Sequence, residues 1–320
     1  MSFPNLSDIV ATTIENRSSE IADNVTKNNA ALAYLSKKGN INPISGGGSV
    51  ILQELSFAEY GNGGWYSGYD LLPVAAQDVL SAAQYSWKQY AVPVTISGLE
   101  QIQNSGEQRM KDLIKERLKV AEATMKNALG GGVYADGTGS GGKQLAGLGA
   151  IVTASPSTGV VGSIDRAAWP FWRNVSTPST GYTGGSSGTL LGYMNALWAQ
   201  LVRGQDRPDL ILAGSGAWAA YSASLQVLQR FTDPAKASMG FPALEYMGAD
   251  LVLDGGIGGF APSAVMYFLN TNYLFLRPSA ERNMVPLGKR EATNQDATVE
   301  ILAWAGAFTA SNCSLQGYLS

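Results

Sequence analysis

The sequence predicts an α+β fold in which one long helix lies on a sheet and a separate α/β segment follows it. Two observations carry this prediction. Apolar residues recur at helical spacing over residues 105–129, between segments that have the composition of strands. From residue 190 onward, helical and strand-like segments alternate before the chain returns to β-type sequence.

The long helix is expected over residues 105–129, where charged residues fill the side opposite the apolar one. Ser105 can cap the first turn, and Gln108 stands at the position of a capping-box partner. Three glycines from Gly130 onward are expected to end the helix. A rod of this length needs a broad apolar surface, most simply a sheet. The alternative is an ordinary surface helix of a globular enzyme.

The spacing of apolar residues over 5–38 predicts an interrupted helix, whose apolar stripe includes Ile9, Ile14 and Ile21. The stripe is too thin to support a domain, so the segment is expected to be an arm that lies on another surface. The alternative is a plain N-terminal helix docked on its own domain.

Two strands are expected next, over residues 49–58 and 84–97, with Pro93 placing part of the second at an edge or a bulge. The connection between them, residues 59–83, is long for a compact domain and contains Trp65, Tyr66 and Tyr69. These aromatic residues predict contact with a partner. A loop folded back onto its own core is the alternative.

The second half of the chain predicts an α/β segment followed by β structure. The expected helices span residues 190–204 and 216–231. The expected strands span residues 209–213, 249–253, 264–269, 273–276, 284–287 and 298–310. No internal repeat is present in the sequence.

The composition limits the chemistry available to the 320-residue chain. There is no histidine, which excludes His-based triads and His-ligated metal sites. The single cysteine, Cys313, excludes internal disulfides and cysteine zinc clusters, and it is expected to be buried. Charged residues make up only 15% and there are 38 glycines, which suggests surface intended for contact with other protein.

The net charge of −3 argues against a protein that grips nucleic acid by its phosphates. No apolar run reaches the roughly 20 residues that span a bilayer. Residues 137–143 match the glycine and lysine positions of a phosphate-binding loop. However, Gln144 stands where the motif has a Ser or Thr whose hydroxyl binds magnesium, and no helix is expected to follow. We therefore expect no cofactor. Two carboxylate pairs remain as catalytic candidates, Glu54 with Glu59 and Asp250 with Asp254.

Several segments, taken in their order, resemble a known family. They are NNAALAYLSKKGNI, FAEYGNGGWYSGY, VPVTISGLEQIQNSGEQRMKDL, GVYADGTGSGGKQLAGL, IDRAAWPFWRN and FTASNCSLQGYL. They are similar to the major capsid protein of tailed double-stranded DNA bacteriophages, which has the Hong Kong-type capsid fold, and in their order the resemblance covers nearly the whole chain. The resemblance implies an N-terminal arm, an extended β-hairpin loop, a peripheral domain with a spine helix on a β-sheet, and an axial α/β domain. On this sequence the arm maps to residues 1–47 and the extended loop to residues 48–87. The peripheral domain maps to 88–145 with 270–307 and includes the spine helix at 105–129. The axial domain maps to 146–269 with 308–320.

The resemblance implies a structural protein with no enzymatic activity, which forms pentamers and hexamers that close into an icosahedral shell around the genome. It implies assembly in the host cytoplasm, with scaffolding, portal and decoration proteins as further partners and without sequence-specific DNA binding. The scaffold is expected to be a separate protein, or the N-terminus to be processed, because the chain starts directly at the arm. The predicted intersubunit contacts are Trp65, Tyr66, Tyr69, Ile9, Ile14 and Ile21.

Family members that crosslink their subunits use a lysine in the extended loop. Residues 49–87 contain no lysine, so we expect a shell without that crosslink. Two alternatives remain open: an encapsulin-like shell around protein cargo, and a carboxylate-based carbohydrate-active enzyme whose Trp and Tyr residues stack on sugars.

Overall fold

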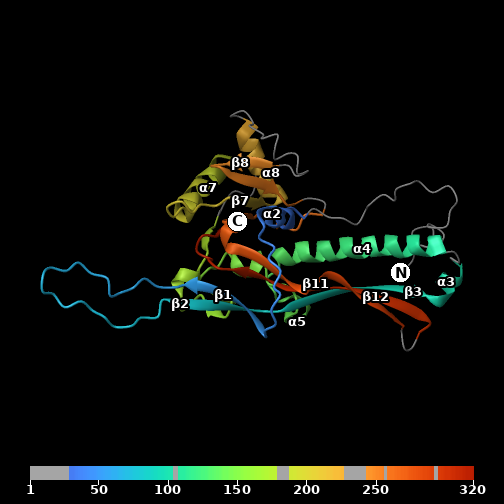
Figure 1. The fold of residues 1–320 in the computed structure, drawn as a ribbon. Coiled ribbons are helices and arrows are strands. Elements are labelled where there is room, and N and C mark those ends of the chain that lie inside the picture. Colours follow the sequence, from blue (N-terminus) through green and yellow to red (C-terminus); the bar gives the residue numbers. More distant parts are fainter. Residues whose placement is uncertain (1–28, 104–106, 179–186, 227–242, 256–257, 292–294) are drawn as a thin grey trace.

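The computed structural model describes residues 29–103, 107–178, 187–226, 243–255, 258–291 and 295–320. A long helix runs beside a three-stranded sheet, and a loop projects from a two-stranded hairpin at one end of this layer (Figure 1). A second, six-stranded sheet with its own helices lies to one side of the layer. This arrangement confirms the predicted α+β class.

The long helix is α4, Glu107–Tyr134, and it packs on the sheet formed by β3 (Lys88–Ser97), β12 (Ala297–Ala310) and β11 (Leu274–Glu291). The expected helix on a sheet is therefore confirmed. Ala121 and Met125, on the predicted apolar side, are buried in one core with Leu302 and Trp304 of β12. Burial of this face, rather than helix propensity alone, stabilises so long a helix.

The prediction that α4 ends at Gly130 is wrong, because the helix continues through the three glycines to Tyr134. The glycines permit close packing instead. A Cβ on Gly130 would overlap the Asn29 side chain and lie 2.8 Å from the Phe260 ring, and one on Gly132 would lie 3.2 Å from Leu145. A residue without a side chain lets these neighbours approach the helix backbone.

The three-stranded sheet is antiparallel in the order β11-β12-β3, so β12 is the central strand. Prolines occur only on the two edge strands of this sheet, with Pro93 on β3 and Pro278 and Pro286 on β11. A proline cannot donate to a ladder, which explains its confinement to edges and confirms the placement of Pro93. The two strands expected at 273–276 and 284–287 are parts of the single strand β11, interrupted by shifts in register.

The extended hairpin consists of β1 (Val50–Ser56) and β2 (Leu80–Ser86), paired antiparallel from Val50↔Ser86 to Ser56↔Leu80. The single strand predicted over 84–97 is in fact two, because β2 pairs with β1 whereas β3 pairs with β12. The chain changes sheet at Trp87, whose indole N–H donates to the Gly48 carbonyl (2.9 Å).

The six-stranded sheet has the order β6-β13-β10-β7-β9-β8, with β7/β9 and β13/β6 parallel and the other pairs antiparallel. Its faces alternate along each strand: Leu210 and Leu212 of β7 join the core that contains α4, whereas Ile211 and Ala213 join a second core beneath α7 and α8. Its elements are β6 (Val175–Thr177), α7 (Ser187–Leu201), β7 (Leu210–Ala213), α8 (Ser215–Gln226), β8 (Ala243–Tyr246), β9 (Ala249–Leu253), β10 (Met266–Leu269) and β13 (Gly317–Leu319).

Helix α2, Ala30–Lys38, docks on the core of its own chain and buries Tyr34 and Leu35 there. This part of the predicted arm therefore follows the alternative of a helix docked on its own domain. Residues 5–28 of the predicted arm helix lie outside the described residues. The remaining short elements are α3 (Gly98–Gln103), α5 (Gly139–Gly142), α6 (Leu148–Ile151), β4 (Val160–Val161), β5 (Ile164–Asp165), η1 (Pro170–Trp172) and η2 (Thr271–Tyr273).

Candidate intersubunit surface

The base of the β1–β2 hairpin is fixed to the body of the molecule. Its inner face buries Ile51, Leu55 and Tyr85. The Tyr85 hydroxyl donates to the Ala310 carbonyl (3.0 Å) and accepts from the Ala310 N–H (3.1 Å), and burial raises the pKa of this phenol. Arg277 donates from β11 to the Gln53 side chain (2.7 Å). The hairpin is therefore a rigid support for whatever it carries.

Beyond Phe57, whose N–H donates to the Val79 carbonyl (3.0 Å), the chain forms the projecting loop, residues 58–78. Amide side chains join its two halves: Gln77 donates to the Asn62 side chain (2.8 Å) and accepts from the Gly61 N–H (2.7 Å). Near the tip, the Ser67 N–H donates to the Asp70 carboxylate (2.8 Å). These local bonds order the loop without any contact to a core.

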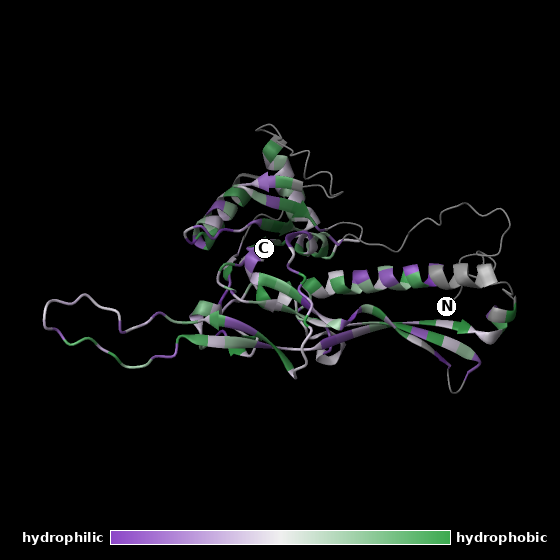
Figure 2. Ribbon diagram, viewed as in Figure 1, coloured by the Kyte–Doolittle hydropathy of each residue, from purple (hydrophilic) through white to green (hydrophobic). Residues whose placement is uncertain are grey.

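The projecting loop exposes a continuous set of large apolar side chains. Trp65 and Tyr69 have the exposure of free side chains, 106% and 105%, and Leu71 and Val74 are almost as open. Figure 2 shows the hydrophobic colour along the half of the loop that returns to β2. Single exposed apolar residues are common on proteins, whereas a contiguous group marks an interaction surface. The alternative that the loop folds back onto its own core is wrong.

Of the predicted contact residues, Trp65, Tyr66 and Tyr69 lie together on this projecting loop and are exposed. Their role between subunits stays a prediction. Ile9, Ile14 and Ile21 lie outside the described residues, so their role stays a prediction as well.

A buried polar pair joins the end of α4 to the six-stranded sheet. The Tyr134 hydroxyl donates to the Asp254 carboxylate (2.6 Å), which follows β9 and has no exposed surface. Burial raises the pKa of Asp254, although hydrogen bonds from Tyr134 and from the backbone of Phe260 and Ala31 partly oppose the shift. Burial and the adjacent carboxyl raise the pKa of Tyr134 well above its ordinary value, so the phenol stays protonated and donates.

The catalytic candidates are not arranged as a site. Glu54 lies opposite Ala82 on the hairpin and Glu59 lies in the projecting loop, whereas Asp254 is sealed in the interior with Tyr134. Among the described residues, no group of three or more His, Cys, Asp or Glu side chains could hold a metal ion. In the same part of the chain, no helix has the length and hydropathy needed to cross a membrane. Cys313 is buried as expected.

An aromatic cluster beside the hairpin was missed as a candidate site. Phe57 at the start of the projecting loop contacts Trp169 and Phe171, with ring centroids 5.7 and 6.3 Å apart. The density of aromatic residues in Trp169–Trp172 was the available signal. The sequence could not show that this segment lies against Phe57, because more than a hundred residues separate them.

Solved structures share this architecture over nearly the full length of the chain. A cyanophage A-1(L) capsid subunit matches with a TM-score of 0.70 and 14% identity, covering 96% of both chains. A capsid subunit of a native GTA particle matches with a TM-score of 0.65 and 12% identity over 98% of both chains. The capsid of the Myoviridae phage XM1 matches with a TM-score of 0.54 and 13% identity, covering 95% of this chain and 96% of that one.

No protein-family model and no curated protein matches the sequence. The structural likeness establishes the fold, so the predicted phage capsid fold is confirmed.

Proposed function

We propose that this chain is the structural major capsid protein of a tailed double-stranded DNA phage. Copies associate through pentamers and hexamers into an icosahedral shell that encloses the genome. The observation that carries this proposal is an exposed apolar loop, rigidly held at its base, on a chain with the fold of phage capsid subunits. In cyclic assemblies a surface of one copy meets a different surface of the next, which suits a loop that projects away from its own body.

Within this proposal the chain divides as the sequence resemblance implies, with an arm at 1–47 and the extended loop at 48–87. The peripheral domain is 88–145 with 270–307, and the axial domain is 146–269 with 308–320. The aromatic residues of the projecting loop contact a neighbouring copy, and Ile9, Ile14 and Ile21 of the arm contribute further contact.

The remaining partners belong to the same proposal. A mildly acidic subunit with a net charge of −3 suits a container that does not bind its DNA tightly or by sequence. Portal, scaffolding and decoration proteins would complete the particle, which would assemble in the host cytoplasm. The chain would have no enzymatic role, since Glu54 and Glu59 are both exposed, whereas Asp254 is sealed in the interior and its candidate partner Asp250 is only partly buried.

The test removes the projecting loop and keeps the hairpin. Replacing residues 58–78 by Asn-Gly joins Phe57 to Val79 through a two-residue turn, which suits an antiparallel pair. We expect a folded subunit with an unchanged far-ultraviolet circular dichroism spectrum and no shells by negative-stain microscopy, whereas the wild-type chain forms shells. Normal shells from the shortened chain would contradict the role of the loop, and a wild-type chain that stays monomeric would contradict the proposed function.

The contents of the particles distinguish a genome container from an encapsulin-like compartment. We expect particles isolated from a productive infection to contain double-stranded DNA that nuclease removes only after the shell is opened. Particles that contain a protein cargo and no DNA would support the compartment instead.

A further inference from the structure

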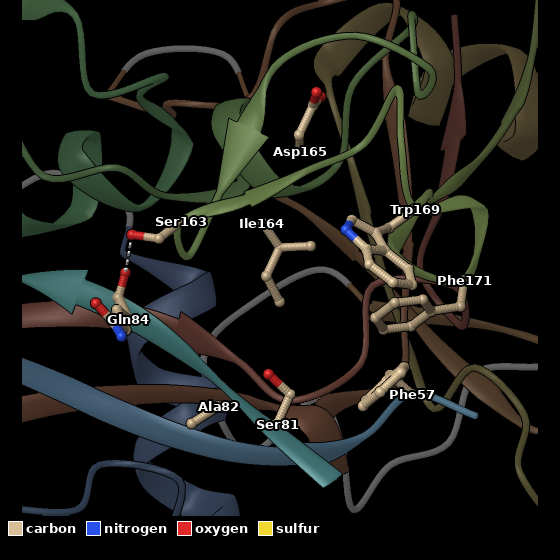
Figure 3. A pocket seen from close by; sticks show the side chains of 9 residues that line it. All are labelled: Phe57, Ser81, Ala82, Gln84, Ser163, Ile164, Asp165, Trp169 and Phe171. Carbon is tan, nitrogen blue, oxygen red and sulfur yellow. Dashed lines mark hydrogen bonds between the residues drawn. The ribbon is translucent and has the colours of Figure 1, made fainter. Parts of the chain in front are cut away.

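A cavity of about 470 Å³ lies at the base of the projecting loop (Figure 3). Phe57, Trp169 and Phe171 form one wall, and β2 contributes Ala82 and Gln84. Ile164 points into the space between these two sides. A cavity of this volume can accept one large side chain or a small ligand.

The chemistry of the lining favours a neutral aromatic occupant. The rings of Trp169 and Phe171 have centroids 6.0 Å apart at 72°, and Trp169 makes a similar edge contact with Phe57. Trp169 is still 47% exposed, so its ring can accept a further aromatic partner. The only ionisable lining residue is Asp165, which Figure 3 shows pointing away from the cavity and which therefore provides no site for a cation.

The cavity is preformed in the free subunit. The Gln84 N–H donates to the Gly162 carbonyl (2.8 Å), which joins the free edge of β2 to the segment that carries the opposite side. Trp172 is buried beneath this segment, and its indole N–H donates to the Val161 carbonyl (2.9 Å). Binding to a preformed cavity avoids the entropic cost of ordering its walls.

We propose that this cavity receives the aromatic tip of the projecting loop of a second copy of the chain, with Trp65 inserted against the Trp169 wall. This inference rests on the proposed function and names the acceptor of the loop. The chain itself supplies the matching group, because Trp65 is a fully exposed aromatic side chain. Trp65 does not fill the cavity of its own subunit. That cavity is lined by Phe57 and Ser81 at the base of the projecting loop, whereas the tip of the loop lies at its far end (Figure 1). Donor and acceptor are therefore different surfaces of one chain, the arrangement that closes rings of copies.

Disulfide trapping tests the contact directly, since the only native cysteine, Cys313, is buried and burial raises the pKa of its thiol to about 12. We combine Ser67→Cys, which is exposed two residues from Trp65 and leaves that side chain in place, with Gln84→Cys, oxidise assembled particles, and run a non-reducing denaturing gel. Each subunit both donates and accepts, so the expected result is a ladder of trimers and larger species that a reductant removes. The matched control combines Ser67→Cys with Met247→Cys, at an exposed turn between two strands of the six-stranded sheet, and should give no ladder.

A second pair of variants fills the cavity without touching the loop. Ala82→Trp places a large side chain inside it, whereas Val160→Trp adds the same side chain at an exposed position that does not line it. We expect at least a tenfold loss of particles for Ala82→Trp alone, with the thermal midpoints of both variants near that of wild type. Particles without the ladder, equal ladders from both cysteine pairs, or normal yield from a folded Ala82→Trp variant would each overturn this occupant. Wild-type chain that forms no particles would overturn the proposed function itself.

Discussion

The junction at the C-terminal end of α4 predicts opposite effects for the same substitution at two glycines. Gly147 lies against the end of the helix, and a Cβ there would overlap the backbone carbonyl oxygens of Val133 and Gly132. Gly192 lies inside α7 with no atom within 4 Å of the position of a Cβ. Both changes to alanine remove the same conformational freedom from the unfolded chain, so the difference between them comes from the folded state.

The expected magnitudes follow from these contacts. Gly192→Ala should raise the free energy of unfolding by up to about 1 kcal/mol, because alanine is the better helix former. For Gly147→Ala, overpacking lowers the free energy of unfolding by ~1–3 kcal/mol. We expect a value in the upper half of this range, because the added Cβ meets helix backbone, which cannot move aside as a flexible side chain can. The net loss of about 2 kcal/mol corresponds to a thermal midpoint roughly 3 °C lower in a chain of this size.

The measurement is thermal and urea unfolding of unassembled subunits, followed by circular dichroism. A Gly147→Ala variant as stable as wild type, alongside the expected gain for Gly192→Ala, would refute the close approach of the two segments. Loss of stability in both variants would show that the contrast does not come from packing.

Three further predictions concern ionisable groups. Burial raises the pKa of Asp254 in the folded subunit above its value in the unfolded chain. The free energy of unfolding of wild type therefore falls as the pH rises from the unfolded-state pKa to the folded-state pKa. Asp254→Asn has no ionisable group at this position, so its free energy of unfolding relative to wild type should increase across that pH range. A pH-independent difference would contradict this. Hydrogen bonds from Arg117 lower the pKa of Glu100 in the folded subunit. The Glu100 carboxylate therefore contributes to stability above its unfolded-state pKa, and this contribution is lost as the pH falls through its folded-state pKa. Glu100→Gln should therefore weaken the subunit at neutral pH and match wild type in acid, as urea titrations can check. Cys313 should resist iodoacetamide until the subunit unfolds, and rapid native labelling would show that it is accessible.

Local patterns in the sequence predicted the main elements of the fold because their periodicity records burial directly. The apolar positions of α4 and the edge placement of Pro93 are local signals with one dominant physical reading. The end of α4 is different. A run of glycines is consistent with a helix stop and with close packing, and the neighbours that decide between them, Phe260 and Leu145, come from elsewhere in the chain.

The same limit applies to the candidate surface. The aromatic residues of the projecting loop could be identified because a long glycine-rich connection with several of them has no core of its own to fill. The break between β2 and β3 could not be identified from the sequence. The strand-like composition continues through Trp87, whereas the pairing partner changes there from β1 to β12. The cavity at the loop base joins residues near 57, 82 and 169, so no local pattern reveals it.

In the proposed shell, the contacts of the projecting loop would allow assembly to be corrected and yet leave the finished shell stable. Burying one large aromatic or aliphatic side chain contributes about 1.5–3 kcal/mol. Ordering each flexible side chain at an interface costs about 0.5–1.5 kcal/mol, and association itself costs several more. One loop seated on one neighbour is therefore weak, and a misplaced subunit can leave. In the proposed closed ring, a subunit would be held by its own loop and by that of its neighbour, so both contacts would have to break before it escapes. The free subunit keeps its apolar tip away from its own core, and this leaves the tip available for the next copy.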